Sequence, residues 1–233
     1  MTFPERFSDL PEYAFPRLRR LLADVPSGGS VPVDMTIGEP RHPMPDFVPK
    51  VLSATAAEFA KYPPNEGTPG LRGAIADWVE RRFGAACDPD REVMALNGTR
   101  EGLFNAAVAL CPEAKHGQRP AVLIPNPFYQ VYAVAARAAG AEPVYVEARA
   151  ETGFLPDFAA LPDEVLDRTA IAYLCSPSNP QGAVADAAYW RALLALAERH
   201  DFRVFADECY SEIWRAAPPP GAWGAADRAG AHR

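Results

Sequence analysis

Sulfur is scarce in this sequence of 233 residues, which contains only four cysteines, Cys87, Cys111, Cys175 and Cys209. No two of them form a CxxC pair, so neither a metal site nor a disulfide framework is indicated, and we expect buried, reduced thiols. No apolar run approaches the roughly 20 residues that a membrane helix needs, and the first ten residues lack the apolar centre of a signal peptide. These absences predict a cytoplasmic protein with no metal site and no membrane contact.

Positive charge is also in short supply. The formal net charge is −7, and no stripe of lysine and arginine interleaved with aromatic residues occurs. This balance argues against nucleic acid or an anionic membrane as a partner. The sequence also has neither the GxGxxG fingerprint of dinucleotide-binding folds nor a Walker loop. The alternative of a Rossmann-type nucleotide-binding module therefore lacks its diagnostic glycines.

The sequence does contain a regular alternation of short apolar runs and helical patterns. We expect strands at 92–96, 121–125, 143–146, 170–175 and 203–206, and helices at 15–24, 46–60, 68–84, 99–110, 128–139 and 186–200. Strands that alternate with helices predict an α/β fold, with a mostly parallel sheet sandwiched by helices. Ligands bind such sheets at the carboxyl ends of the strands.

Composition divides the chain into three parts. Residues 1–45 are expected to form an N-terminal arm with part of a small domain, and 46–214 to form the large domain that carries the sheet. Residues 215–233 are rich in alanine, glycine and proline. A segment with so little to bury predicts an aberrant or disordered tail.

Polar residues follow several of the expected strands. The turn Gly98-Thr99-Arg100 precedes a helix, where free backbone N–H groups and the helix dipole suit a phosphate. Such a turn also serves as a plain connection. Asp207, at the end of another strand, could pair with a cation or cap a turn, and Tyr210 follows three residues later. Tyr129 could stack on a planar ligand or pack in the core, and Asn179 could donate a hydrogen bond or form a turn.

The combination is more specific than its parts. The matching segments are Ile37-Gly38-Glu39-Pro40, Tyr62 with Gly67 and Leu71-Arg72, Asn97-Gly98-Thr99-Arg100-Glu101, Pro127-Phe128-Tyr129, Ser178-Asn179-Pro180-Gln181-Gly182 and Asp207-Glu208-Cys209-Tyr210. With them, the chain resembles class I/II aminotransferases of the pyridoxal-phosphate (PLP) fold type I from about Phe15 to Trp214. The resemblance implies an incomplete large domain of that fold, PLP as cofactor, and an amino acid and a 2-oxo acid as substrates.

The resemblance also implies a role for each cofactor-binding residue. Gly98, Thr99 and Arg100 would form the phosphate site, and Tyr129 would stack on the pyridine ring. Asn179 and Tyr210 would hydrogen-bond the phenolic oxygen of the ring. Asp207 would pair with the protonated ring nitrogen, since an ionised carboxylate keeps that nitrogen protonated.

Two further residues carry implied roles outside the cofactor site. Gly38 would lie near the substrate carboxylate, and Tyr62 would reach the phosphate of a partner subunit, which implies a homodimer. Within the family, five segments are similar to succinyldiaminopimelate aminotransferases of lysine biosynthesis: Tyr13–Arg19, Gly38–Pro43, Tyr62–Pro64, Asn97–Glu101 and Pro125–Tyr129. An aspartate-type or aromatic-type aminotransferase is the alternative.

One departure from the family is plain. Its Schiff-base lysine lies downstream of the Asp-x-x-Tyr segment, whereas Lys50, Lys61 and Lys115, the only lysines here, all precede Asp207. The carboxylate-binding arginine has no counterpart either. We therefore expect a truncated or frameshifted chain without transaminase activity, because no catalytic lysine is available as nucleophile or base. A non-catalytic protein that binds PLP is the competing hypothesis.

Overall fold

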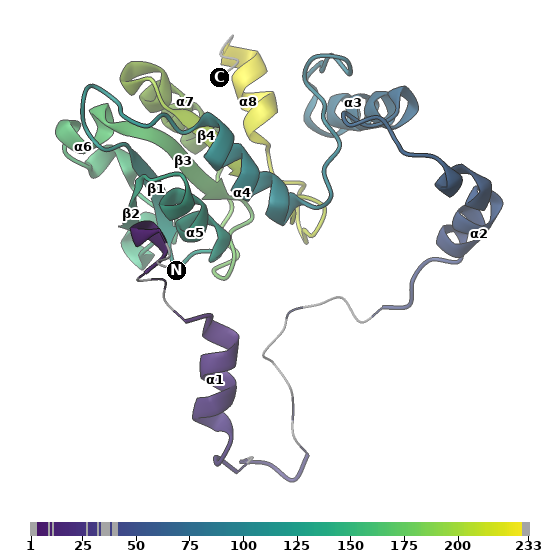
Figure 1. Ribbon diagram of the computed structural model, residues 1–233, viewed down its shortest axis with the longest axis horizontal. Helices are drawn as coiled ribbons and strands as arrows, with labels where there is room; N and C mark the ends of the chain where they lie inside the picture. The colour runs from purple at the N-terminus through teal and green to yellow at the C-terminus, as the bar shows by residue number, and fades with distance from the viewer. Residues whose placement is uncertain are drawn as a thin grey trace. The chain divides into compact units, whose positions relative to one another are not determined.

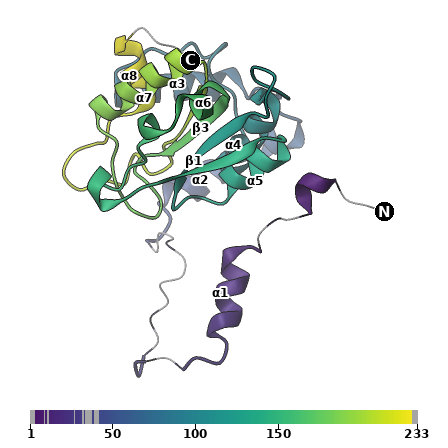
Figure 2. The same ribbon diagram turned by 90° about the vertical axis from the view of Figure 1, so that its left-hand side faces the viewer.

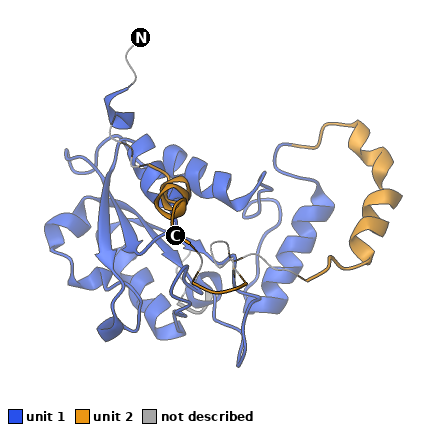
Figure 3. Ribbon diagram, turned by 90° about the horizontal axis from the view of Figure 1, so that it is seen from below, with its two compact units in different colours: residues 1–8, 65–233 blue, residues 9–64 orange. Residues whose placement is uncertain are grey.

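The computed structural model describes residues 4–8, 10, 12–26, 28–31, 33, 38 and 42–229. It divides into two compact units (Figure 3): Met1–Ser8 with Asn65–Arg233, and Asp9–Pro64. We call them the sheet unit and the N-terminal unit. The boundary lies at 64/65 and not at the expected 45/46, because the helices within 46–64 bury none of their residues.

Within its described residues, the sheet unit contains four parallel strands (Figure 1). They are β1 (Ala121–Asn126), β2 (Glu142–Glu147), β3 (Thr169–Cys175) and β4 (Arg203–Asp207), in the order β2-β1-β3-β4. The register pairs the last residues of neighbouring strands, so that Cys175 lies opposite Asp207. The expected parallel α/β fold is confirmed, and the carboxyl ends of β3 and β4 meet at one edge.

Helices cover both faces of this sheet, because successive residues of a strand point to opposite sides. On one face, Val122 and Ile124 pack with α4 (Thr99–Leu110) and α5 (Val131–Ala138). On the other face, Leu123 packs with the second group of helices (Figure 2). That group comprises α6 (Asp163–Asp167), α7 (Ala187–His200) and α8 (Ala222–Ala229), with the short 3-10 turn η4 (Phe158–Ala160).

Local signals fixed several helix ends. The Thr68 hydroxyl accepts a hydrogen bond from the Leu71 N–H at the start of α3 (Pro69–Phe83), and α3 ends at Gly84, whose φ is 67°. The Asp186 side chain caps α7 in the same way by accepting from the Tyr189 N–H at 2.7 Å. These caps satisfy N–H groups that a helix start leaves free. The helix expected from residue 128 begins three residues later, as α5.

The expected strand at 92–96 does not form. The segment is irregular, and its Ala95 N–H donates to the Glu66 carbonyl. A strand needs a neighbour, and within the described chain β4 is the edge of the sheet, with no strand beyond it. The segment packs instead over α4, where an added Cβ on Gly102 would lie 2.3 Å from Leu96.

The tail expected to be disordered contains α8, and Ala225 and Ala226 of this helix are buried in the core beside α7. The small residues that suggested disorder are packing positions. An added Cβ on Gly221 or on Gly224 would lie 2.6 Å from atoms of Phe83. Low side-chain volume was therefore wrongly interpreted as a lack of packing.

The N-terminal unit buries none of the residues of its helices, α1 (Ala14–Leu22), α2 (Phe47–Ala54) and the 3-10 helix η2 (Ala56–Ala60). The motif residues 37, 39 and 40 lie outside the described residues. Two more 3-10 turns, η1 (Glu5–Phe7) and η3 (Ala150–Thr152), belong to the sheet unit. None of the helices in the described residues combines the length and the apolar character needed to cross a membrane.

Candidate functional site

A cavity of about 450 Å³ opens where β3, β4 and the start of α4 come together. Its size falls in the range of small-molecule sites. The residues that line it are Gly98, Thr99, Arg100, Glu101, Leu103, Tyr129, Cys175, Asn179, Asp207, Cys209 and Tyr210. All seven residues expected around a cofactor are therefore gathered at one place. Four lining residues were not predicted, although Cys175 ends a strand and Cys209 lies inside the Asp-x-x-Tyr segment, and both positions are signals that the strand-end rule could have used.

The amino end of α4 lines one side of the cavity. Gly98 precedes the helix with a φ of 133°, a backbone conformation that residues with a Cβ rarely adopt, and no side chain caps the helix there. A helix start of this kind presents backbone N–H groups and a partial positive charge. Thr99 and Arg100 add a hydroxyl and a guanidinium, so this side of the cavity suits an anion.

Arg100 and Tyr129 contact each other directly. The Arg100 Nε donates to the Tyr129 hydroxyl at 2.6 Å, and its guanidinium carbon lies 5.9 Å from the centre of the Tyr129 ring. Tyr129, which is expected to stack on the ligand, is thus hydrogen-bonded to Arg100, which is expected to bind the phosphate of the same ligand. This contact could not be predicted from local sequence patterns, because 29 residues separate the two.

Asp207 supplies the buried negative charge of the cavity, since only 7% of its surface is exposed. Its Oδ2 accepts a hydrogen bond from the hydroxyl of Tyr132 at 2.6 Å, and its Oδ1 accepts the Cys209 N–H at 3.4 Å. Burial, and then the charge of Asp207, raise the pKa of Tyr132 well above its usual range, so this phenol remains a donor. Sequence reasoning missed Tyr132, which follows Tyr129 by three residues.

The two thiols of the cavity are neutral. Burial, and then the charge of Asp207, raise the pKa of Cys175 to about 11 and that of Cys209 to about 12. Burial also raises the pKa of Tyr210. A protonated thiol is a poor nucleophile and carries no negative charge. These two cysteines therefore do not compete with the carboxylate of Asp207 for a positively charged ligand.

Asn179 lies in the loop that follows β3. The loop is closed by hydrogen bonds between the Ser178 N–H and the Ala183 carbonyl at 2.8 Å, and between the Gly182 N–H and the Ser178 carbonyl at 2.7 Å. The peptide bond before Pro180 is cis. The turn expected at these residues is thus present, and it carries Asn179 to the cavity.

Lys115, the lysine of the sheet unit, lies at the other end of the strands. Its Nζ donates to the carbonyls of Thr169, His200 and Asp201 at 2.6, 2.6 and 2.8 Å. Thr169 begins β3 and His200 ends α7, so the ammonium group satisfies carbonyls at the amino ends of the strands. It cannot reach the cavity at their carboxyl ends without breaking these bonds.

Gly38 and Tyr62 belong to the N-terminal unit and are described within it alone. Tyr62 is fully exposed, and no atom of the described residues lies within 4 Å of the position of a Cβ on Gly38. Their expected roles toward substrate and partner subunit remain predictions. Among the described residues, no group of three or more histidine, cysteine or acidic residues could hold a metal ion.

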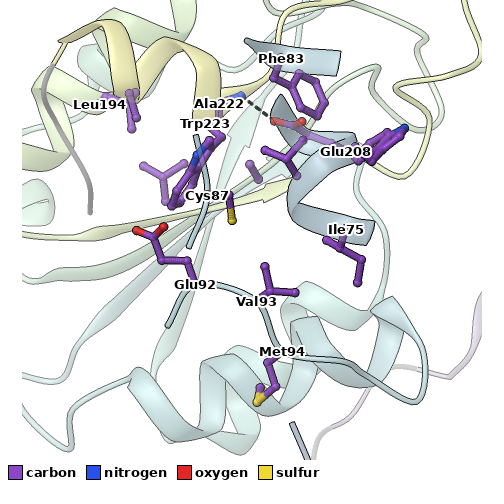
Figure 4. A pocket seen from close by; sticks show the side chains of 15 residues that line it. Ile75, Phe83, Cys87, Glu92, Val93, Met94, Leu194, Glu208, Ala222 and Trp223 are labelled. Carbon is purple, nitrogen blue, oxygen red and sulfur yellow. Dashed lines mark hydrogen bonds between the residues drawn. The ribbon is translucent and has the colours of Figure 1, made fainter. Parts of the chain in front are cut away.

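A second cavity, of about 460 Å³, lies beside the edge strand β4 (Figure 4). Its walls are mainly apolar and include Ile75, Phe83, Met94 and Trp223, with the carboxylate of Glu208 at one side. None of the expected cofactor residues is among its lining residues. We therefore place the candidate site in the first cavity.

The sequence profile of the family described as "Aminotransferase class I and II" matches residues 31–231. The chain belongs to this family. The match includes α8, so the expectation that residues 215–233 depart from the family is wrong. Members of the family depend on PLP.

Individual relatives agree with this assignment. The LL-diaminopimelate aminotransferase of Desulforudis audaxviator is 38% identical over 220 residues, which cover 91% of this chain and 54% of the relative. The enzyme of the same name from Dehalococcoides mccartyi is 36% identical, with the same coverage. The crystal structure of an aminotransferase from Neisseria meningitidis superposes with a TM-score of 0.90 at 35% identity, covering 98% of this chain and 58% of that one. The chain spans about half the length of the curated relatives it matches.

Proposed function

We propose that this chain supplies the PLP-binding part of an enzyme that transfers an amino group between an amino acid and a 2-oxo acid. The observation that carries the proposal is one cavity with an anion-binding helix start on one side and a buried carboxylate, Asp207, among its other walls. PLP needs both, because it carries a phosphate and a ring nitrogen that is positive when protonated. The residues present therefore fit the cofactor.

Seven of the eleven lining residues have a role in this proposal. The α4 N–H groups with Thr99 and Arg100 bind the phosphate, and Gly98 allows the backbone to turn into the helix. Tyr129 stacks on the ring, while Asn179 and Tyr210 hydrogen-bond its phenolic oxygen. Asp207 holds a proton on the ring nitrogen. When bound, PLP supplies the electron sink for amino-acid chemistry.

The residues of this chain bind and orient the cofactor, but we propose that they do not complete a transamination. A proton must be moved at the substrate, and Lys115 is committed to three backbone carbonyls at the far end of the strands. The thiols of Cys175 and Cys209 stay protonated at neutral pH. Neither Lys115 nor these two thiols is thus available as a general base for this step.

Borohydride reduction of the PLP-saturated chain tests whether the chain binds PLP without forming a covalent bond to a lysine. We expect saturable PLP binding by absorbance, no lysine labelled in stoichiometric amount, and no turnover above that of free PLP. Gly98→Val, which forces a branched side chain into an unfavourable backbone conformation, should abolish binding. Stoichiometric labelling of one lysine, or turnover by the chain alone, would contradict the proposal.

For the substrate we propose a diaminopimelate, and the names of the relatives favour LL-diaminopimelate over its N-succinyl derivative. The two differ at the distal amino group, which is a cation in the first and a neutral amide in the second. Calorimetric titration of the PLP-saturated chain with LL-diaminopimelate, N-succinyl-LL-diaminopimelate and aspartate separates these candidates from an aspartate-type enzyme. Equal heats with all three would leave the chain as a PLP-binding protein without substrate preference.

A further inference from the structure

Tyr132 lies outside the set of residues that line the cavity, yet it contacts the charge partner of the proposed cofactor. Its hydroxyl donates to Oδ2 of Asp207 at 2.6 Å, across 75 residues of sequence. The side chain is entirely buried, and Asp207 is nearly so. A short hydrogen bond between a buried donor and a carboxylate is of the charge-assisted, stronger kind.

The ring of Tyr132 is itself held on two sides. It stacks on Tyr173 with the ring centres 4.4 Å apart and the planes at 14°, and it meets Tyr129 edge-on at 5.8 Å. Tyr173 in turn donates its hydroxyl to the Leu103 carbonyl at 2.8 Å. Because protein interiors are close-packed, a ring fixed in this way can place its hydroxyl with little freedom.

The two oxygens of Asp207 therefore differ. Oδ2 is taken by a short bond to Tyr132, whereas Oδ1 accepts the Cys209 N–H at 3.4 Å, beyond the usual range of N–H···O bonds. A carboxylate oxygen has room for further donors. Oδ1 is thus the oxygen with capacity for a new N–H donor from the cavity.

We propose that Tyr132 is a positioning residue that holds Oδ2 of Asp207 so that Oδ1 faces the protonated ring nitrogen of PLP. The inference rests on the proposed function, because it concerns the same cavity. Without the hydroxyl the carboxylate can rotate about its own bonds, and Oδ2 is left as a buried acceptor with no partner from the tyrosine. Part of the orientation that favours the cofactor is then lost.

The test compares Tyr132→Phe with Tyr173→Phe in titrations of the chain with PLP. Both variants keep the stacked rings and lose one buried hydroxyl bond, but only the first loses a bond to Asp207. We expect Tyr132→Phe to weaken PLP binding about tenfold, which corresponds to ~1.4 kcal/mol. Tyr173→Phe keeps the ring that stacks on Tyr132 and every bond to Asp207, so it should weaken binding far less.

A PLP analogue with a C–H in place of the ring nitrogen provides a readout that a purely structural role would not separate. Tyr132→Phe should bind this analogue as the unchanged chain does, since the analogue has no N–H for Asp207. In an Asp207→Ala background, Tyr132→Phe should cause no further loss, because the double-mutant cycle removes the shared partner.

Three outcomes overturn the inference. The first is unchanged or tighter PLP binding by Tyr132→Phe, and the second is an equal loss for PLP and the analogue. The third is a further loss in the Asp207→Ala background. If Tyr132→Phe does not fold, Tyr132→His takes its place: a ring N–H can still donate to Asp207, so this variant should bind PLP as the unchanged chain does, and an equal loss for PLP and the analogue would overturn the inference. Failure of the unchanged chain to bind either ligand would overturn the proposed cofactor site, and this inference with it.

Discussion

At the scale of single residues, the site depends on side chains that serve two purposes at once. Tyr129 offers a ring face to the cavity, and its hydroxyl also accepts from Arg100 at 2.6 Å. Asp207 is a counter-ion for the cofactor in our proposal, and it is also the acceptor for Tyr132. Substitutions at Tyr129 and at Asp207 should therefore remove different interactions and should weaken PLP binding to different extents.

We expect Asp207→Ala to weaken PLP binding more than Tyr129→Phe. Loss of a buried charge partner costs about 2–5 kcal/mol, whereas Tyr129→Phe keeps the stacking face and removes one solvent-exposed hydrogen bond to Arg100, which contributes less. Absorbance titration of both variants measures the difference. Equal affinities would mean that Asp207 does not meet the ring nitrogen.

At the scale of elements, the half-buried carboxylate of Glu208 joins the end of β4 to α8. The Ala222 N–H at the start of α8 donates to Oε1 of Glu208 at 2.6 Å (Figure 4). Arg82 of α3 holds the same stretch of chain, through Glu212 and through the carbonyls of Ser211 and Pro219. Burial raises the pKa of Glu208, while the Ala222 N–H and Arg82 oppose that rise.

This shift predicts how stability depends on pH. Because the folded state holds the Glu208 proton more tightly than the unfolded state does, the stability from Glu208 is present at low pH and is lost as pH rises through the folded pKa. Glu208→Gln keeps the acceptor for Ala222 and removes the charge. We expect it to raise the Tm at pH 7 relative to the unchanged chain by about 2–4 °C for each kcal/mol recovered, with little difference at pH 4.

Glu212→Gln is the matched control, because this carboxylate is more than half exposed although it also bonds Arg82 at 2.6 Å. Exposed ion pairs contribute little, so its Tm should change little at either pH. A loss of stability in Glu208→Gln at pH 7 would show that attraction between Glu208 and Arg82 outweighs the cost of burying the charge.

At the scale of the whole molecule, the N-terminal unit exposes apolar side chains that it cannot bury by itself. On α2, Phe47 and Val51 are 65% and 55% exposed, and they are four residues apart and so lie on one face of the helix. Exposed apolar faces of this kind mark association surfaces. We propose that a second copy of the chain covers this face, in line with the dimer that the resemblance implies.

Sedimentation velocity tests the association. We expect the unchanged chain to sediment as a dimer, and Phe47→Glu with Val51→Glu to shift it to the monomer. Lys50→Glu is the control, because it adds an acidic group to the same helix and leaves both Phe47 and Val51 unchanged. A chain that is monomeric over the whole concentration range would rule out this surface as a dimer contact.

Much of the fold was predictable because it is encoded locally. Four of the five expected strands form, since buried parallel strands are continuous apolar runs, and α4 spans the residues expected for it. The rule that ligands bind at the carboxyl ends of parallel strands then identified the residues of one cavity. A helix start after Gly98 and an acidic residue after an apolar strand are signals within a few residues of sequence.

The tertiary structure decided what depends on distant partners. The segment 92–96 has the composition of a strand and does not become one, because within the described chain no strand lies beyond β4 to pair with it. The residues of α8 have the composition of a loose tail and form a helix, because Phe83 leaves no room for a side chain at Gly221 or Gly224, and Ala225 and Ala226 pack in the core beside α7. Tyr132 meets Asp207, and Lys115 meets His200, only after the sheet has brought residues 75 and 85 positions apart into contact. Local patterns fix the periodicity of a segment, whereas its partners are fixed by packing of the whole chain.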